Sequence, residues 1–144
     1  MNRSERRRQK KKSRSTASTL PMRTDSVAPS EVSEQMQSLI AAGKTAHASG
    51  DLEKAIQTYS HILSIDPKQP TALYLLGIVF LQSGKNEQAI EFIRRSLSVF
   101  PENPEANNNL GVALNAAGKT EEAATSYRQA IKLKPDYTAA YKNL

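Results

Sequence analysis

The chain has 144 residues, of which 24% are charged and 38% are hydrophobic, enough for one modest domain. It contains no cysteine, so disulfides, thiolate metal sites and cysteine nucleophiles are excluded. No apolar run approaches the roughly 20 residues that a membrane-spanning helix needs, and no signal-peptide core is present. We therefore expect a cytoplasmic protein, or a nuclear one if the source is eukaryotic.

The net charge of +6 comes from the N-terminal segment. Residues 1–24 carry nine lysines and arginines against one acid, whereas residues 25–144 carry eleven against thirteen. Because residues 1–24 have very few large apolar side chains, they cannot bury enough surface to offset the entropy of ordering. We expect residues 1–33 to be a basic, disordered tail and linker. Its cluster RRRQKKK at residues 6–12 could contact nucleic acid or anionic lipid weakly, act as a nuclear localisation signal, or only keep the protein in solution.

From about residue 34 onward the sequence repeats every 34 residues. Apolar residues recur at helical spacing inside each copy, which predicts two helices per copy. We expect a domain at 34–144, with repeats at about 36–69, 70–103 and 104–137 and the start of a fourth at 138–144. The strongest columns are Gly43, Gly77 and Gly111; Gly50, Gly84 and Gly118; Ala55, Ala89 and Ala123; and Pro67, Pro101 and Pro135.

Helix-pair packing explains these columns. Glycine inside a helix costs about 1 kcal/mol relative to alanine, so the first glycine column indicates a close approach of two helices. The alanine column supplies the small facing residue, and Tyr59, Ile93 and Tyr127 fill the remaining volume. The second glycine column suits the left-handed position after a helix, and the proline column ends each second helix. Pro104 suits the first turn of the next helix, with Asn103 as its N-cap.

The columns resemble the tetratricopeptide repeat, whose 34-residue pattern is W-x2-L-G-x2-Y, then A-x3-F, then P. The resemblance covers about residue 35 to the end of the chain. Departures are mild: Asn107 stands where a large apolar residue is usual, and Ala42 and Ala46 make the first copy lighter. The resemblance implies an all-α fold, a right-handed superhelix of antiparallel helix pairs whose first helices line a concave groove. It also implies a protein-binding scaffold.

In this family the groove is lined by the second, fifth, sixth, ninth, twelfth and thirteenth positions of each repeat. The resemblance therefore implies a peptide-binding surface that is apolar in its middle and rich in amides towards the C-terminus. Ile78 and Leu81 have an alternative role, since they could simply pack within the helix layer. We call the implied set the groove residues: Lys44, His47, Tyr74, Ile78, Leu81, Asn108, Asn109, Val112, Asn115 and Asn143.

Two subtypes of the family can be compared at these positions. Repeats that grip acidic chaperone tails use a clamp of cations and amides, and the matching positions here form a poor clamp: Ile40, Lys44, Leu75, Glu105 and Asn109. Asn109 and Asn143 share the sixth position, where an amide can both donate to and accept from a peptide backbone. This resembles the start of the asparagine ladder in the arm of O-linked N-acetylglucosamine transferases, although Ala41 and Leu75 interrupt it.

That resemblance leaves a second function open. The chain could be the N-terminal substrate-recruiting arm of a larger enzyme, such as an O-linked N-acetylglucosamine transferase-like glycosyltransferase or a sulfotransferase. The last helix stops at Leu144 without the polar cap that repeat arrays usually have, so we expect a fragment. Only a longer parent protein would then be an enzyme.

The remaining motifs do not indicate catalysis. Residues 41–45 and 116–120 both read AAGKT, but a phosphate-binding loop needs a further glycine where Ser38 and Ala113 stand, and a strand before it. Neither histidine has a second histidine at helical spacing, His61 has no carboxylate there, and Asp51, four residues after His47, lies beyond the glycine that ends the helix. We expect no catalytic residue, no metal and no cofactor in this chain, and a protein or peptide as its partner.

Overall fold

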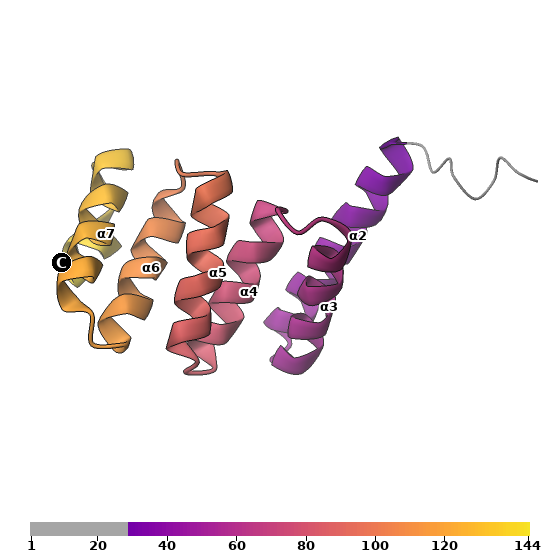
Figure 1. Ribbon diagram of the computed structural model, residues 1–144, viewed down its shortest axis with the longest axis horizontal. Coiled ribbons are helices and arrows are strands. Elements are labelled where there is room, and N and C mark those ends of the chain that lie inside the picture. Colours follow the sequence, from indigo (N-terminus) through magenta and orange to yellow (C-terminus); the bar gives the residue numbers. More distant parts are fainter. Residues whose placement is uncertain (1–28) are drawn as a thin grey trace, which may run out of the picture. The chain divides into compact units, whose positions relative to one another are not determined.

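The structure, a computed structural model, describes residues 29–144, and this part of the chain is helical with no strand (Figure 1). The chain divides into two units, residues 1–35 and 36–144. Within the second unit each helix from α3 onward packs against the next in chain order. The helices are α2 (Pro29–Ala48), α3 (Leu52–Ile65), α4 (Pro70–Gln82), α5 (Asn86–Val99), α6 (Pro104–Ala116), α7 (Thr120–Leu133) and α8 (Thr138–Asn143).

The first helix begins earlier than expected. Residues 29–33, which the sequence pattern assigns to the linker, belong to α2. The predictions for the basic cluster at residues 6–12 lie outside the described residues. From α3 onward the helix bounds follow the 34-residue period, so the all-α repeat solenoid is confirmed, with α8 as the start of a fourth copy.

The two helices of each pair meet where the first glycine column stands. A Cβ atom on Gly77 would lie 2.6 Å from Cγ1 of Ile93 and 3.3 Å from the carbonyl oxygen of Ala89, so no side chain fits there. Gly43 and Gly111 are blocked in the same way by the rings of Tyr59 and Tyr127. The predicted close approach is therefore confirmed in all three pairs. We call this contact the pair seam.

The large side chains of the pair seam belong to the buried core. Tyr59 and Ile93 are fully buried, and Tyr127 is 4% exposed. The hydroxyl of Tyr59 has no hydrogen-bond partner within residues 29–144. Burial raises the pKa of Tyr59 and of Tyr127 above the ordinary value, because a phenolate would lose its hydration there.

The helix ends have the predicted causes. The second glycine column has positive φ angles of 82°, 74° and 79°, a region that suits residues without a Cβ. After α4 the N–H of Lys85 donates to the carbonyl of Phe80 at 2.9 Å, closing the last turn as in a Schellman motif. At the start of α6, the side chain of Asn103 accepts from the N–H of Ala106 at 3.0 Å, so the predicted N-cap is confirmed.

Candidate functional site

The groove residues lie on α2, α4, α6 and α8, the first helices of successive repeats. These side chains differ in how much of their surface is exposed to solvent, because they lie at the edge of the core. Lys44, Asn115 and Asn143 are exposed, and Asn108 is buried at 6% exposure. The half-buried members are His47, Tyr74, Ile78, Leu81, Asn109 and Val112.

Three hydrogen bonds link groove residues to side chains of the neighbouring repeat, and in each bond the two residues are 35 positions apart. The ring Nε2 of His47 donates to Oε1 of Gln82 at 2.6 Å. The second and third bonds join Tyr74 to Asn109 and Asn108 to Asn143. The second and third bonds occur at equivalent positions, because each joins the fifth residue of one repeat to the sixth residue of the next. We call these contacts the cross-repeat pairs.

Gln82 is absent from the sequence-based prediction although it bonds to a groove residue. A signal was present, because Gln82 occupies the thirteenth position of its repeat, one of the positions that the family resemblance assigns to the groove. An amide at that position can accept from a histidine ring on the preceding first helix. The Nε2 atom of His47 is therefore engaged by a neighbouring repeat.

Tyr74 and Asn109 form a partly buried cross-repeat pair. Nδ2 of Asn109 donates to the hydroxyl of Tyr74 at 2.7 Å. Burial raises the pKa of Tyr74, and the nearby Tyr137 and Glu105 raise it further, while the bond from Asn109 acts in the opposite direction. Tyr74 is therefore a neutral hydroxyl at physiological pH, able to donate its own hydrogen to a ligand.

Asn108 and Asn143 form the next cross-repeat pair, in which Nδ2 of Asn143 donates to Oδ1 of Asn108 at 3.2 Å. Asn108 is nearly inaccessible to solvent. Its side chain therefore connects α6 to α8 instead of presenting a free amide. The exposed amides of the set are those of Asn115 and Asn143, with Asn109 half-exposed.

Asn107 has a structural role that explains its departure from the family pattern. It is buried, and its Nδ2 donates to the carbonyl oxygens of Asn103 at 2.9 Å and of Pro101 at 3.4 Å. A buried amide is stable only when it is hydrogen-bonded, and here it fastens the turn between α5 and α6. The run of three asparagines thus divides into one turn anchor and two members of cross-repeat pairs.

The apolar groove residues also contribute to the core. Ile78, Leu81 and Val112 are half-buried and pack against the hydrophobic core cluster. The alternative role proposed for Ile78 and Leu81, packing within the helix layer, therefore holds for part of each side chain. The part of each of these three side chains that remains exposed is apolar, and we call these exposed parts the apolar strip.

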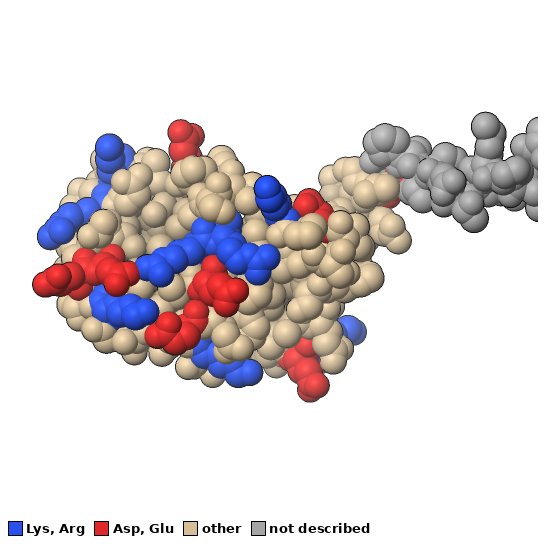
Figure 2. Space-filling view, viewed as in Figure 1, with Lys and Arg blue, Asp and Glu red and all other residues tan. Residues whose placement is uncertain are grey.

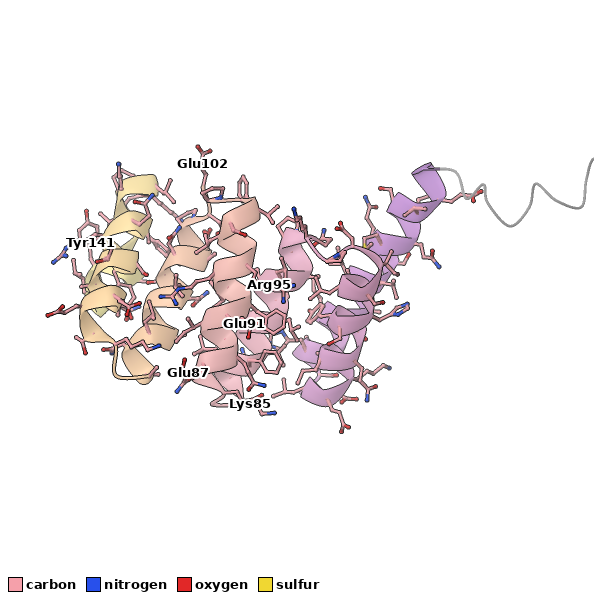
Figure 3. All side chains as sticks on the ribbon, in the orientation of Figure 1. Lys85, Glu87, Glu91, Arg95, Glu102 and Tyr141 are labelled. Carbon is pink, nitrogen blue, oxygen red and sulfur yellow. The ribbon has the colours of Figure 1, made fainter. Side chains whose placement is uncertain are left out.

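The second helices carry a different surface. Glu87, Glu91 and Arg95 project from α5 in Figure 3, and Figure 2 shows lysines and arginines mixed with acids over this part of the unit. Arg94 pairs with Glu122 at 2.6 Å, and Lys119 pairs with Glu87 at 3.4 Å. Because basic and acidic side chains are mixed and paired here, this surface favours neither a negatively nor a positively charged ligand. A basic patch that binds nucleic acid would differ in this respect.

Residues 29–144 contain no group of histidines and acids that could hold a metal ion. None of the helices in this range has the length and apolar character that a membrane span requires. The first AAGKT segment, residues 41–45, lies inside α2. The second, residues 116–120, spans the end of α6 and the beginning of α7. Neither segment follows a strand.

Two family models match the sequence. One, described as Tetratricopeptide repeat, matches residues 74–138, and the other, described as TPR repeat, matches residues 43–84. Together they cover residues 43–138, which include nearly all of the groove residues. Among curated proteins, none matches the chain.

Several solved structures resemble the chain. An O-GlcNAc transferase mutant from Thermobaculum terrenum is 30% identical with a TM-score of 0.74, over 78% of this chain and 22% of that one. MamA is 24% identical with a TM-score of 0.72, over 75% of this chain and 63% of its own. The first TPR of Spaghetti (RPAP3), bound to the HSP90 peptide SRMEEVD, is 22% identical with a TM-score of 0.75, over 77% and 88%. The latter two show the fold alone.

Proposed function

Because the chain belongs to the tetratricopeptide repeat family, we propose that it is a protein–protein interaction module that binds a peptide or protein segment along the groove residues. Repeats of this family bind partners and do not catalyse reactions. The observation that carries the proposal is the row of cross-repeat pairs: polar side chains of α2, α4, α6 and α8 meet beside an apolar strip. A row of this kind suits an extended segment, which needs backbone partners and apolar contacts together.

One solved structure of similar fold contains a bound peptide. The first TPR of Spaghetti (RPAP3) was solved with the HSP90 peptide SRMEEVD. Its similarity to this chain lies in the fold, so the identity of the peptide does not transfer. Peptide binding as such fits the half-exposed amide of Asn109 and the exposed amide of Asn115.

Selection from a random peptide display library on the full chain tests the proposal. We expect enriched peptides whose affinity falls about five- to thirtyfold in Asn109→Ala, because one or two hydrogen bonds of about 1 kcal/mol each are lost. The matched control is Gln88→Ala on α5, an exposed amide on the opposite helix layer, which should bind as the parent does. If no peptide is enriched, or if both variants bind equally by calorimetry, the proposal is wrong.

A second candidate function is the substrate-recruiting arm of a larger enzyme. The similarity to the O-GlcNAc transferase, at 30% identity, favours it, although the chain spans only 22% of that protein. The coding sequence beyond Leu144 distinguishes the two. An α/β region with a nucleotide-sugar site would support the arm of a glycosyltransferase, whereas further repeats followed by a stop codon would support a free-standing scaffold.

A further inference from the structure

The first helices of the second and third repeats carry almost no charge on the groove side. Of the twelve residues that α4 and α6 place at the family's groove positions, one is charged, and it is the acid Glu105. A ligand lying along these two helices would therefore meet a single charge, and that charge is negative. The twelve are Thr71, Tyr74, Leu75, Ile78, Leu81, Gln82, Glu105, Asn108, Asn109, Val112, Asn115 and Ala116.

Glu105 is exposed, in the first turn of α6. Within residues 29–144 no lysine, arginine or histidine lies within ion-pair distance of its carboxylate. The outer acids Glu87 and Glu122 differ in this respect, because each has a basic partner on a neighbouring repeat. The carboxylate of Glu105 is thus available for a cation from a ligand.

Two phenol rings lie near this carboxylate. Tyr74 is held by its bond from Asn109, and Tyr137, half-buried, precedes α8. Glu105 lies one helical turn before Asn109 on α6, Asn109 bonds to Tyr74, and α8 packs against α6, so both tyrosines belong to the same part of the unit as Glu105. Burial raises the pKa of both tyrosines, and the negative charge of Glu105 raises each further, in agreement with this arrangement. A carboxylate beside aromatic rings is a common environment for an ammonium or guanidinium group.

The chain already contains one contact of this chemistry. Nζ of Lys134 lies 5.0 Å from the ring centroid of Tyr137. This lysine covers one face of the Tyr137 ring, and the contact is an example of the cation–aromatic interaction that the ring supports.

We infer that the groove residues select an extended peptide that places a lysine or arginine side chain beside Glu105, Tyr74 and Tyr137. The inference rests on the proposed function and names the chemistry of the partner. It also separates this chain from repeats that hold acidic chaperone tails. A carboxylate at this place would face Glu105, and the apolar Ile40 and Leu75 stand where that clamp needs polar or basic groups.

The test uses the same random display library on the full chain, followed by calorimetry with the most enriched peptide. We expect the enriched peptides to share a lysine or arginine. Affinity should fall about threefold in Glu105→Gln, the value of a partly exposed ion pair, and about tenfold in Glu105→Lys. Replacing the shared cation of the peptide by glutamate should restore binding to Glu105→Lys. The matched control is Glu91→Lys on α5, which should not alter the affinity.

The outcomes separate the inference from the proposed function. If peptides are enriched without a shared cation, or if Glu105→Lys binds them as well as the parent does, the inference fails while peptide binding stands. Preference for the acidic peptide SRMEEVD would also overturn it. If no peptide is enriched, both fail. If the peptide binds more tightly after residues 6–12 are changed to alanine, the chain's own basic cluster competes for the site, and the inference of a separate basic partner is wrong.

Discussion

Inside each helix pair a glycine of the first helix faces a large side chain of the second: Gly43 meets Tyr59, Gly77 meets Ile93 and Gly111 meets Tyr127. Between neighbouring pairs the contacts differ from one repeat to the next. Tyr74 accepts from Asn109, whereas Asn108 accepts from Asn143. The equivalent pair of positions in the first repeat holds two apolar residues, Ile40 and Leu75.

The difference follows from burial. The pair seam is close-packed, so only glycine fits on the first helix. A single added methyl group would overlap a neighbouring side chain or backbone. The cross-repeat pairs are partly exposed, so water can replace a lost partner and several residue types are tolerated. We therefore expect the pair seam to determine the fold, and any difference in partner preference to arise at the cross-repeat pairs.

Gly77→Leu tests the pair seam and should have the largest effect. The new side chain would overlap Ile93 and the backbone at Ala89, which cannot move without separating α4 from α5. We expect a loss of unfolding free energy of about 1–3 kcal/mol or more, measured by urea denaturation followed by circular dichroism. Gln88→Leu, an exposed change on α5, is the control. Coincident denaturation midpoints for the two variants would refute the packing argument.

Asn107→Ala should have an intermediate effect. Its amide is buried and bonded to the backbone of the turn before α6, so it belongs with the pair seam in energetic terms although it is polar. We expect a loss of about 1–2 kcal/mol in the same denaturation experiment. The comparison variant is Asn115→Ala on the same helix, where the amide is exposed and little change is expected. An equal loss at both positions would show that burial does not separate these asparagines.

Tyr74→Phe should have the smallest effect on stability. It removes the hydroxyl that accepts from Asn109, but Asn109 is half-exposed and can bond to water instead. We expect a change below about 1 kcal/mol, measured by thermal melting. Tyr59→Phe makes the matched change at the pair seam, where the hydroxyl is buried without a partner, and should be neutral or stabilising. A larger loss for Tyr74→Phe than for Asn107→Ala would contradict the division between seam and groove.

The positions of the helices follow from the sequence because their signals are local. Gly84 and Pro101 end helices through their own backbone preferences, and Asn103 caps α6 through a bond three residues away. The same period identifies the pair seam, since a glycine at one helical position in three copies has a packing cause. The start of α2 is the exception: the sequence pattern places the linker up to residue 33, whereas the helix begins at Pro29, a residue that suits a first turn.

The sequence alone therefore determined the repeat, the helix pairs and the residues at which the two helices of each pair meet. Only the tertiary structure decided what each groove amide does. Asn107, Asn108 and Asn109 are chemically identical neighbours, yet one anchors a turn, one accepts from α8 and one donates to α4. The physical reason is that a helix turns each successive side chain by about 100°, so their partners come from three different elements. The proposed preference for a cation likewise depends on Tyr74, Glu105 and Tyr137, which come from α4, α6 and the residue before α8 and are brought together by packing.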